Sequence, residues 1–149
     1  MFHLSKHIYS LERKMLHISH LPTAFEYYSA LHLTRYYRKP FFVYQDVPPS
    51  KKADFGFPIQ DKGVDIIDEH FQHIAQVKYY KEYSQIHYGK LATFLATPLL
   101  VGKKLDMTLV RTDHCLLHSD IKQIVMRGDV KDIALCNRDF LQTMQFTQK

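Results

Sequence analysis

Residues 62–80 read KGVDIIDEHFQHIAQVKYY, and this stretch decides how the rest of the chain can fold. Residues 64–67 and 74–79 are short runs rich in β-branched and aromatic side chains, and a polar turn separates them. Two such runs joined by a few polar residues are typical of a β-hairpin. Pairing of Asp68 with His73 would fix the register of the whole hairpin.

That register brings polar side chains together on one face of the hairpin. Asp65 then lies opposite Gln76, and Lys78 lies opposite Gly63, where the missing side chain leaves room for a substrate. Because side chains alternate across a strand, Gln76 and Lys78 share one face. The other face takes Ala75, Val77 and Tyr79. A carboxylate, an amide oxygen and an ammonium therefore converge, and we interpret this face as a candidate site.

Strands alternate with helices after this hairpin, which indicates an α/β sandwich around a mixed sheet of about five strands. The second helix begins near Pro22 or Thr23, and Ser84 and Ser119 are the predicted N-caps of the next two. Helices are predicted over 8–18, 22–37, 85–96, 119–125 and 139–145. Strands are predicted over 40–44, 64–67, 74–79, 105–110 and 131–135.

Length and composition fit a single domain. The chain has 149 residues, of which 46% are hydrophobic and 23% charged, and it is long enough to bury a core. No apolar run approaches the roughly 20 residues of a membrane span, and the N-terminus lacks the features of a secretory signal. Cys115 and Cys136 sit in separate apolar segments without a CxxC spacing. We interpret them as buried thiols in a reducing, intracellular compartment.

Basic residues offer several candidate contacts to a polyanion. The formal net charge of +5 agrees with such a partner but does not require one. The connection 45–61 is long for a compact domain, and its Lys51 and Lys52 could grip phosphates or simply lie in solvent. Tyr80 and Lys81 follow the hairpin, and interleaved aromatic and basic side chains can stack bases and hold phosphates. The alternative is that such tyrosines line the edge of the core.

The hairpin residues have the chemistry that phosphodiester hydrolysis needs. The reaction requires a hard cation that polarises the phosphate and lowers the pKa of an attacking water. Mg²⁺ prefers oxygen ligands and keeps several waters, so the Asp65 carboxylate, the Gln76 amide oxygen and an inward-facing Val77 carbonyl would suffice. Lys78 could orient the water or stabilise charge on the phosphorane. On its own this pattern is weak, because Gln and Lys are common on the solvent face of a strand.

Other catalytic arrangements find less support. His70, His73 and His87 lie near one another in the sequence, but they lack a recurring ligand spacing and are expected to be exposed or at an edge. His114 directly precedes Cys115, and neighbours on a strand point apart, so a cysteine nucleophile is not indicated. The sequence contains no glycine-rich phosphate loop, which argues against nucleotide hydrolysis.

The hairpin resembles that of the PD-(D/E)XK nuclease superfamily, and most closely its Mrr-like restriction endonuclease branch. In that branch a "GVD" strand precedes a "Q-x-K" strand, as in Gly-Val-Asp-Ile-Ile at 63–67 and Ala-Gln-Val-Lys-Tyr-Tyr at 75–80. The flanks also have counterparts: a helix that bears Phe25 and Glu26 precedes the core, and strand 132–135 leads into a helical segment. The resemblance covers residues 23–145. It implies a restriction-endonuclease-like α/β/α sandwich.

Carried over residue by residue, the resemblance implies a role for each polar residue of the hairpin. Asp65 is the metal-binding carboxylate, Gln76 takes the place of the commoner second acid, and Lys78 is the catalytic lysine. Glu26 matches an acid that many members place beside the metal, although it could instead be a charge at the start of a helix. The Gly-Val-Asp context distinguishes Asp65 from the two flanking acids, Asp61 and Asp68.

The expected function is that of a Mg²⁺-dependent DNA endonuclease that can use Mn²⁺ as a substitute ion. Residues 23–149 would form the nuclease domain, and residues 1–22 would form an N-terminal helical extension. A single site cuts one strand per event, so double-strand cleavage calls for a homodimer or two sequential cuts. Two alternatives stay open. Gln76 removes a charge, which favours one metal ion and would suit a weakly active DNA-binding module that serves a fused or associated helicase-type partner. A structure-selective junction resolvase would use the same residues.

Overall fold

A five-stranded mixed sheet lies at the centre of the computed structural model, which describes residues 2–60, 63–80 and 83–147. In spatial order its strands are β1 (Phe41–Val43), β2 (Ile66–Asp68), β3 (His73–Lys78), β5 (Asp106–Thr112) and β7 (Lys131–Leu135). Strands β1, β2 and β3 pair antiparallel, whereas β3, β5 and β7 pair parallel. The predicted mixed sheet of about five strands is confirmed.

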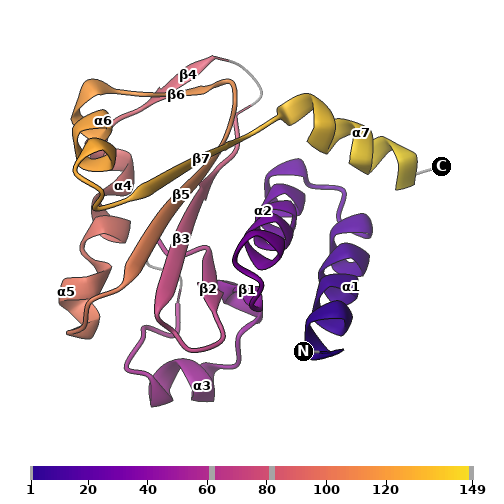
Figure 1. The fold of residues 1–149 in the computed structure, drawn as a ribbon, viewed down its shortest axis with the longest axis horizontal. Coiled ribbons are helices and arrows are strands. Elements are labelled where there is room, and N and C mark those ends of the chain that lie inside the picture. Colours follow the sequence, from indigo (N-terminus) through magenta and orange to yellow (C-terminus); the bar gives the residue numbers. More distant parts are fainter. Residues whose placement is uncertain (1, 61–62, 81–82, 148–149) are drawn as a thin grey trace.

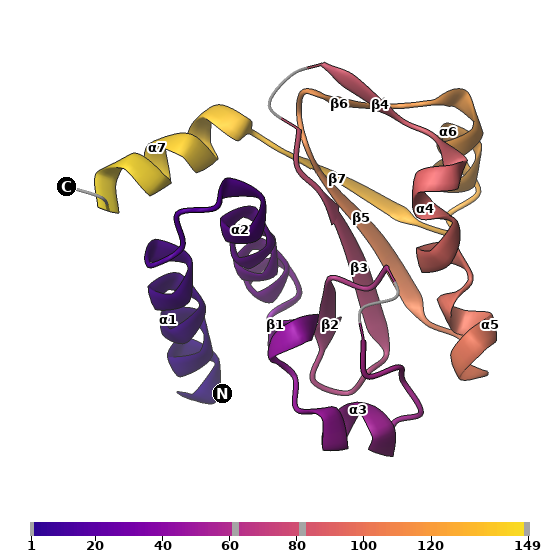
Figure 2. The same ribbon diagram turned by 180° about the vertical axis from the view of Figure 1, so that it is seen from behind.

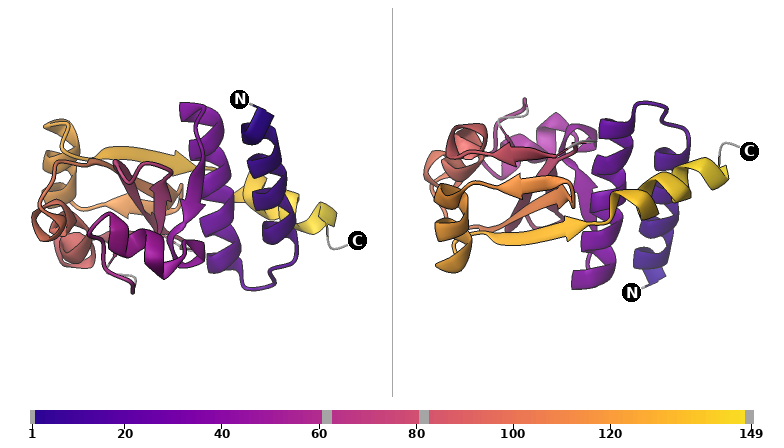
Figure 3. Two further views of the ribbon diagram at one scale, coloured as in Figure 1. Left: turned by 90° about the horizontal axis from the view of Figure 1, so that it is seen from below. Right: turned by 90° about the horizontal axis from the view of Figure 1, so that it is seen from above.

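Helices cover both faces of this sheet, as Figures 1 and 2 show from opposite sides and Figure 3 shows from below and above. One face carries α1 (Phe2–Leu16), α2 (Leu21–Tyr37) and α7 (Asn137–Thr147). The other carries α4 (Tyr88–Leu95), α5 (Thr97–Val101) and α6 (Ser119–Met126), together with a two-stranded sheet of β4 (Ser84–Ile86) and β6 (Cys115–Leu117). The long connection after β1 contains η1 (Tyr44–Asp46) and α3 (Pro49–Asp54). The architecture is an α/β/α sandwich.

The sheet separates two hydrophobic clusters, and β3 contributes to both. The α2-side cluster includes Phe25, Phe41, Ala75, Val110 and Phe140. The α4-side cluster includes Tyr44, Ile67, Ile74, Phe94 and Leu109. Val77 and Tyr79 pack against the α2-side cluster, and Tyr80 packs against the other. The predicted alternation of side chains along β3 is therefore confirmed, with Gln76 and Lys78 on the α4 side.

Helix α1 shares the α2-side cluster with α2. Leu11 and Met15 of α1 are buried in it, and Glu12 forms an ion pair with Arg35 of α2 at 2.7 Å. Because α2 begins at Leu21, the expected boundary after residue 22 falls within its first turn. None of the helices formed by the described residues is long and apolar enough to cross a membrane.

The segment after the hairpin differs from the sequence expectation. Ser84 was the expected N-cap of a helix over 85–96, but Ser84–Ile86 form strand β4 and helix α4 begins at Tyr88. Strand β4 pairs in parallel with β6, and the Ser84 N–H donates to the His114 carbonyl at 3.3 Å. A partner strand 31 residues further along the chain thus overrides the local capping preference of serine.

The N-cap of α6 is also shifted from the expected position. Ser119 is the first residue of the helix, and His118 occupies the cap. The Nδ1 atom of His118 accepts a hydrogen bond from the Asp120 N–H at 3.3 Å. An imidazole nitrogen therefore performs the task that the serine hydroxyl was expected to perform.

Candidate metal and nucleic-acid site

The β2–β3 hairpin has the predicted register, with a local departure at its open end. Ile66 pairs with Ala75 and Ile67 with Ile74, which is the offset that places Asp68 opposite residue 73. The Asp65 N–H, however, donates to the Ala75 carbonyl at 2.9 Å, so Asp65 and Ile66 both face Ala75. Two residues that oppose one residue of the partner strand form a β-bulge.

The bulge changes what the Asp65 carboxylate contacts. The expected direct pairing of Asp65 with Gln76 is wrong, because Asp65 Oδ2 accepts a hydrogen bond from the Val77 N–H at 2.7 Å. The N–H and C=O of one residue in a strand point to the same neighbouring strand, so the Val77 carbonyl faces the same side. The carboxylate of Asp65 is thus held beside the backbone between Gln76 and Lys78.

Asp68, at the other end of β2 from Asp65, stabilises the hairpin turn. Its side chain is 0% exposed, and Oδ1 accepts hydrogen bonds from the N–H groups of Gln72 at 2.7 Å and His73 at 2.9 Å. Lys39 Nζ lies 3.2 Å from Oδ2. The structure therefore separates the two acids, since Asp68 fixes the hairpin loop while Asp65 lies at the open end. Asp61 lies outside the described residues.

The Gln76 side chain provides a test of whether the site fits a hard cation. Gln76 is 7% exposed, and its Oε1 atom is buried without a hydrogen-bond partner among the residues that the structure describes. A buried oxygen without a donor costs about 1–3 kcal/mol, and coordination of a cation would satisfy it. Within 2–60, 63–80 and 83–147, no three His, Cys, Asp or Glu side chains are grouped to hold a metal ion. Carboxylate, amide and carbonyl oxygens are nevertheless the ligand types that Mg²⁺ prefers, and Mg²⁺ keeps several waters, so the chemistry of Asp65, Gln76 and Val77 suits this ion.

Lys78 lies beside an ion pair on the neighbouring strand. It is half-buried, and its register partner on β5 is Arg111. Arg111 Nε lies 2.8 Å from Asp132 Oδ1, and Arg111 Nη2 donates to Asp132 Oδ2 at 3.0 Å. These hydrogen bonds raise the pKa of Arg111. In the described part of the chain, Asp132 is thus neutralised by Arg111, and no carboxylate forms an ion pair with Lys78.

Arg111 was not among the residues that the sequence pattern predicted for this site. The signal that could have found it is a pair of opposite charges within two apolar strands, Arg111 in one and Asp132 in the other. Because β5 and β7 are adjacent and parallel, charges on the same face of both strands are expected to meet.

Glu26 approaches the hairpin from the other face of the sheet. It lines a cavity of about 240 Å³ together with Val77 and Tyr79, and the Tyr79 hydroxyl is buried without a hydrogen-bond partner among the described residues. The remaining lining residues are His20, Pro22 and Thr23. Val77 thus contacts Asp65 through its N–H and lines the cavity of Glu26 with its side chain. Glu26 therefore lies on the α2 side of the sheet, whereas Gln76 and Lys78 lie on the α4 side, so the structure does not bring these predicted site residues together on one face.

Of the candidate DNA contacts in the long connection, only Lys51 presents its side chain to solvent. Lys52 is 4% exposed, donates to the Ile59 carbonyl at 3.0 Å and lies 4.2 Å from the centre of the Tyr44 ring. The prediction that Lys52 contacts DNA is therefore wrong, because its ammonium binds a carbonyl within the connection 45–61. Lys51 is exposed, 5.8 Å from the centre of the Phe42 ring.

Tyr80 is tied to the sheet. The Tyr80 N–H donates to Thr112 Oγ1 at 3.1 Å, and the Thr112 hydroxyl donates back to the Tyr80 carbonyl at 2.9 Å. The ring is half-buried against the α4-side cluster, and burial raises the pKa of the Tyr80 hydroxyl. Tyr80 is thus an edge residue of the core. Lys81 lies outside the described residues.

The histidines of the region lie in separate places. His70 is exposed and lies 3.4 Å from Glu69. His87 packs against the His118 ring with centroids 4.5 Å apart. His73 is only 4% exposed and belongs to β3, which is paired on both sides, so the expectation that it is exposed or at an edge is wrong. It hydrogen-bonds Thr108 on the neighbouring strand, a partner that the sequence did not reveal.

The cysteines are free thiols. Burial raises the pKa of the Cys115 thiol to about 11, although Arg111 and Lys78 oppose this shift. The thiol is therefore protonated at neutral pH. Because only the thiolate is nucleophilic, Cys115 is not an activated nucleophile. Cys136 is half-buried rather than buried as expected.

The missing side chain of Gly63 makes room for helix α4 and not for a substrate. It has a φ of +91°, and a Cβ atom at this position would lie 2.9 Å from the backbone nitrogen of Phe94 in α4. The open space expected opposite Lys78 is thus taken by the close approach of α4. Gly63 is needed both for its backbone conformation and for this contact.

Replacement of Gly63 by alanine is expected to destabilise the protein by about 2 kcal/mol or more, since strained backbone and overpacking each cost about 1–3 kcal/mol. Gly89→Ala is the matched control, because no heavy atom lies within 4 Å of its Cβ position and Gly89 is within helix α4. The control should stabilise by up to about 1 kcal/mol. Urea denaturation measures both, and equal stabilities of the two variants would contradict the contact.

The strand order and the two helical layers define a class, an α/β/α sandwich around a mixed five-stranded sheet. A scan against protein-family models, a search of curated proteins and a search of solved structures each find no match to this chain.

Proposed function

We propose that this chain is a Mg²⁺-dependent DNA endonuclease in which Asp65, the Gln76 amide oxygen and the Val77 carbonyl hold the ion, with Mn²⁺ as a substitute. One observation carries the proposal: the 2.7 Å hydrogen bond from the Val77 N–H to Asp65 Oδ2. It places the single carboxylate of β2's open end against the Gln-Val-Lys run of β3. Bound Mg²⁺ would polarise a phosphate oxygen and lower the pKa of an attacking water.

The remaining groups have supporting roles in this proposal. The Lys78 ammonium, on the same face as Gln76, stabilises the negative charge that develops on the phosphate. Lys51 and the formal net charge of +5 attract the phosphate backbone, so cleavage should slow as salt is raised.

The direct test uses purified protein and Mg²⁺ with four DNA substrates: supercoiled plasmid, linear, methylated and branched DNA. A single-site endonuclease first converts supercoiled plasmid to the nicked form. Linear product in one step would indicate two sites acting together in a homodimer. Preferential cutting of the branched substrate would identify a junction resolvase. Intact DNA in all four reactions, with both Mg²⁺ and Mn²⁺, contradicts the proposal.

Lys78→Ala is expected to slow cleavage about 10²–10³-fold, the usual cost of one lost donor to the transition state. DNA binding should change little, since one of the 20 lysines and arginines is lost. The matched control is Lys90→Ala, which removes an exposed lysine of α4. Nicking rates and filter binding measure the two properties separately. If Lys78→Ala cuts as fast as Lys90→Ala, then Lys78 has no part in the reaction.

A second candidate function is a DNA-binding module that serves a helicase-type partner. It is favoured by the neutral side chain of Gln76, which leaves Asp65 as the charged ligand of the hairpin. Isothermal titration with Mg²⁺ and Mn²⁺ separates the two functions. Saturable binding of either ion that Asp65→Asn weakens supports the enzyme, whereas DNA binding without ion binding supports the module.

A further inference from the structure

A separate cavity of about 640 Å³ lies at the amino ends of the parallel strands β3, β5 and β7. His73 at the start of β3 lines it, whereas Lys78 of the proposed nuclease site ends the same strand. Lys78 is five positions further along the strand than His73, which corresponds to about 16 Å. The volume is in the range of small-molecule sites, about 300–1,000 Å³. The cavity is therefore a distinct site candidate.

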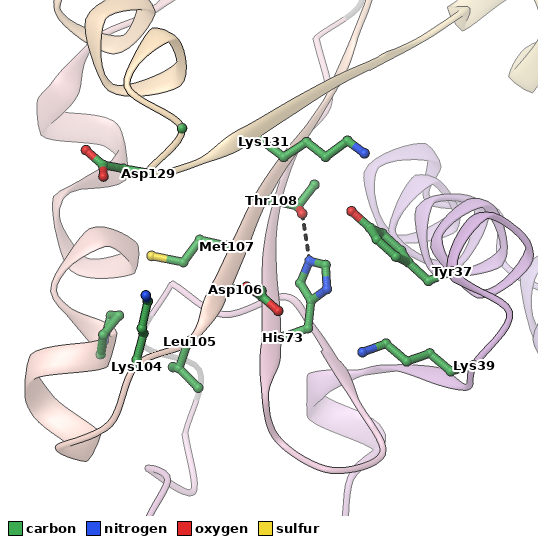
Figure 4. A pocket seen from close by; sticks show the side chains of 12 residues that line it. Tyr37, Lys39, His73, Lys104, Leu105, Asp106, Met107, Thr108, Asp129 and Lys131 are labelled. Carbon is green, nitrogen blue, oxygen red and sulfur yellow. Dashed lines mark hydrogen bonds between the residues drawn. The ribbon is translucent and has the colours of Figure 1, made fainter.

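Lysines from three separate segments surround the cavity, as Figure 4 shows: Lys39 and Lys131 lie along one wall with Tyr37, and Lys104 lies along the other. Lys131 donates to the Tyr36 hydroxyl at 2.7 Å, which raises its pKa, and it lies 4.2 Å from the centre of the Tyr36 ring. The Tyr36 side chain thus holds the Lys131 ammonium in place without contributing a carboxylate.

Acidic groups balance this charge only in part. Asp129 lies across the cavity from Lys131 in Figure 4 and is paired with Arg127 at 3.2 Å. Lys39 is paired with the buried Asp68. Asp106 is exposed in the middle of the cavity. The wall of Tyr37, Lys39 and Lys131 is thus rich in hydrogen-bond donors. Of the two carboxylates that line the cavity, Asp129 is paired with Arg127, and Asp106 forms no ion pair with the described residues.

His73 adds a further donor to this wall. Its Nε2 atom lies 2.7 Å from Thr108 Oγ1, and Thr108 is 0% exposed. His73 is the hydrogen-bond partner of the Thr108 side chain among the described residues, so the threonine hydrogen has an acceptor only if Nε2 accepts. The ring hydrogen of the neutral imidazole is then at Nδ1. Figure 4 shows this second nitrogen turned toward Tyr37 and Lys39.

The imidazole is neutral at physiological pH. Burial lowers the pKa of His73, and Lys39 and Lys131 lower it further, while Asp106 and Asp68 oppose them. An anion bound beside the ring would reverse the effect of the lysines and raise this pKa. His73 can therefore report on occupancy of the cavity.

We propose that this cavity binds a phosphomonoester, carried by a nucleoside 5′-monophosphate or by the 5′ end of a DNA strand. The Lys39 and Lys131 ammonium groups, the Tyr37 hydroxyl and the His73 Nδ1–H contact the phosphate. Asp106 accepts a hydrogen bond from a hydroxyl or amino group of the same ligand. The proposal is independent of nuclease activity, because none of these residues belongs to the Asp65 site.

The test follows the His73 ring by NMR while the full-length protein is titrated with deoxyadenosine 5′-monophosphate, and isothermal titration gives the affinity. Deoxyadenosine is the control without phosphate. A 12-nucleotide strand with a 5′-phosphate, compared with the same strand ending in a 5′-hydroxyl, separates a DNA end from a free nucleotide. Saturable binding that needs the phosphate and raises the His73 pKa is expected. Equal binding of deoxyadenosine, or no His73 response up to 10 mM of either phosphorylated probe, overturns the proposal.

Variants tie the binding to the lysines of the cavity. Lys131→Gln should weaken binding about tenfold or more, the size of one lost charge-assisted hydrogen bond. Lys104→Gln tests the opposite wall and should have a smaller effect. Lys90→Gln, on the exposed surface of α4, should bind like the parent. Equal affinities of Lys131→Gln and Lys90→Gln would overturn the assignment.

Discussion

Asp65→Asn is expected to abolish DNA cleavage, with a loss of about 10³-fold or more. Metal ions contribute several kcal/mol of transition-state stabilisation, and each 1.36 kcal/mol is a factor of ten in rate. The substitution removes the charge of the proposed ligand while an amide oxygen can still accept the Val77 N–H. The fold should therefore survive, and the lost activity would report on the metal rather than on the hairpin.

Plasmid nicking rates and Mg²⁺ titration calorimetry check this expectation together. Asp54→Asn is the matched control, because Asp54 is an exposed acid in α3. The control should cut DNA and bind Mg²⁺ like the parent. A variant Asp65→Asn that binds Mg²⁺ normally and cuts at the parental rate would remove Asp65 from the site.

Asp68→Ala is expected to lower the free energy of unfolding by about 3 kcal/mol, although Asp68 lies three residues from Asp65. The Oδ1 atom accepts from the backbone of Gln72 and His73, and each buried donor left unpaired costs about 1–3 kcal/mol. The Lys39 ion pair is lost as well, but Lys39 is partly exposed and can turn to solvent. Most of the cost therefore comes from the backbone of the turn.

Urea denaturation of Asp68→Ala and of its neighbour Glu69→Ala checks this effect. Glu69 pairs with the exposed His70, and surface pairs contribute about 0–1 kcal/mol. The two adjacent acids should thus differ by at least about 2 kcal/mol, which is the expected excess of the buried group. If Asp68→Ala is as stable as Glu69→Ala, the carboxylate does not hold the turn.

The part of the fold that the sequence predicted well is the hairpin and the sheet built around it. The register that pairs Ile66 with Ala75 followed from the expected pairing of Asp68 with His73, because one pair beside the turn fixes the pairs along the hairpin. Strand β7 was predicted over 131–135 and is found at Lys131–Leu135. Local periodicity was sufficient wherever the two faces of an element were clearly distinct.

The features that the sequence did not predict depend on residues distant along the chain. The bulge at Asp65 is held by the Tyr44 N–H, which donates to the Asp65 carbonyl at 2.8 Å from the far side of β2. Ser84 joins a strand because of residues near Cys115. His73 is buried because Thr108 and the ring of Tyr37 surround it. None of these partners follows from a local pattern.

In the candidate site, too, the features set within one strand were predicted, and those set by distant residues were not. Gln76 and Lys78 share a face as expected, since that depends on alternation within β3. The contact of Asp65 with Val77 rather than with Gln76 depends on the bulge, and the ion pair of Arg111 with Asp132 depends on the order of β5 and β7 in the sheet.

The central place of β3 determines where this chain can change in length. The strand has six residues and is paired on both sides, with β2 and with β5. One inserted residue between His73 and Lys78 would move Lys78 to the face of α2 and break the pairing with both neighbours. Gly56, in the connection before the hairpin, follows helix α3 and pairs with no strand among the described residues. Its N–H donates to the Ala53 carbonyl at 3.0 Å, so an added residue there would change the end of α3 but leave the register of the sheet intact.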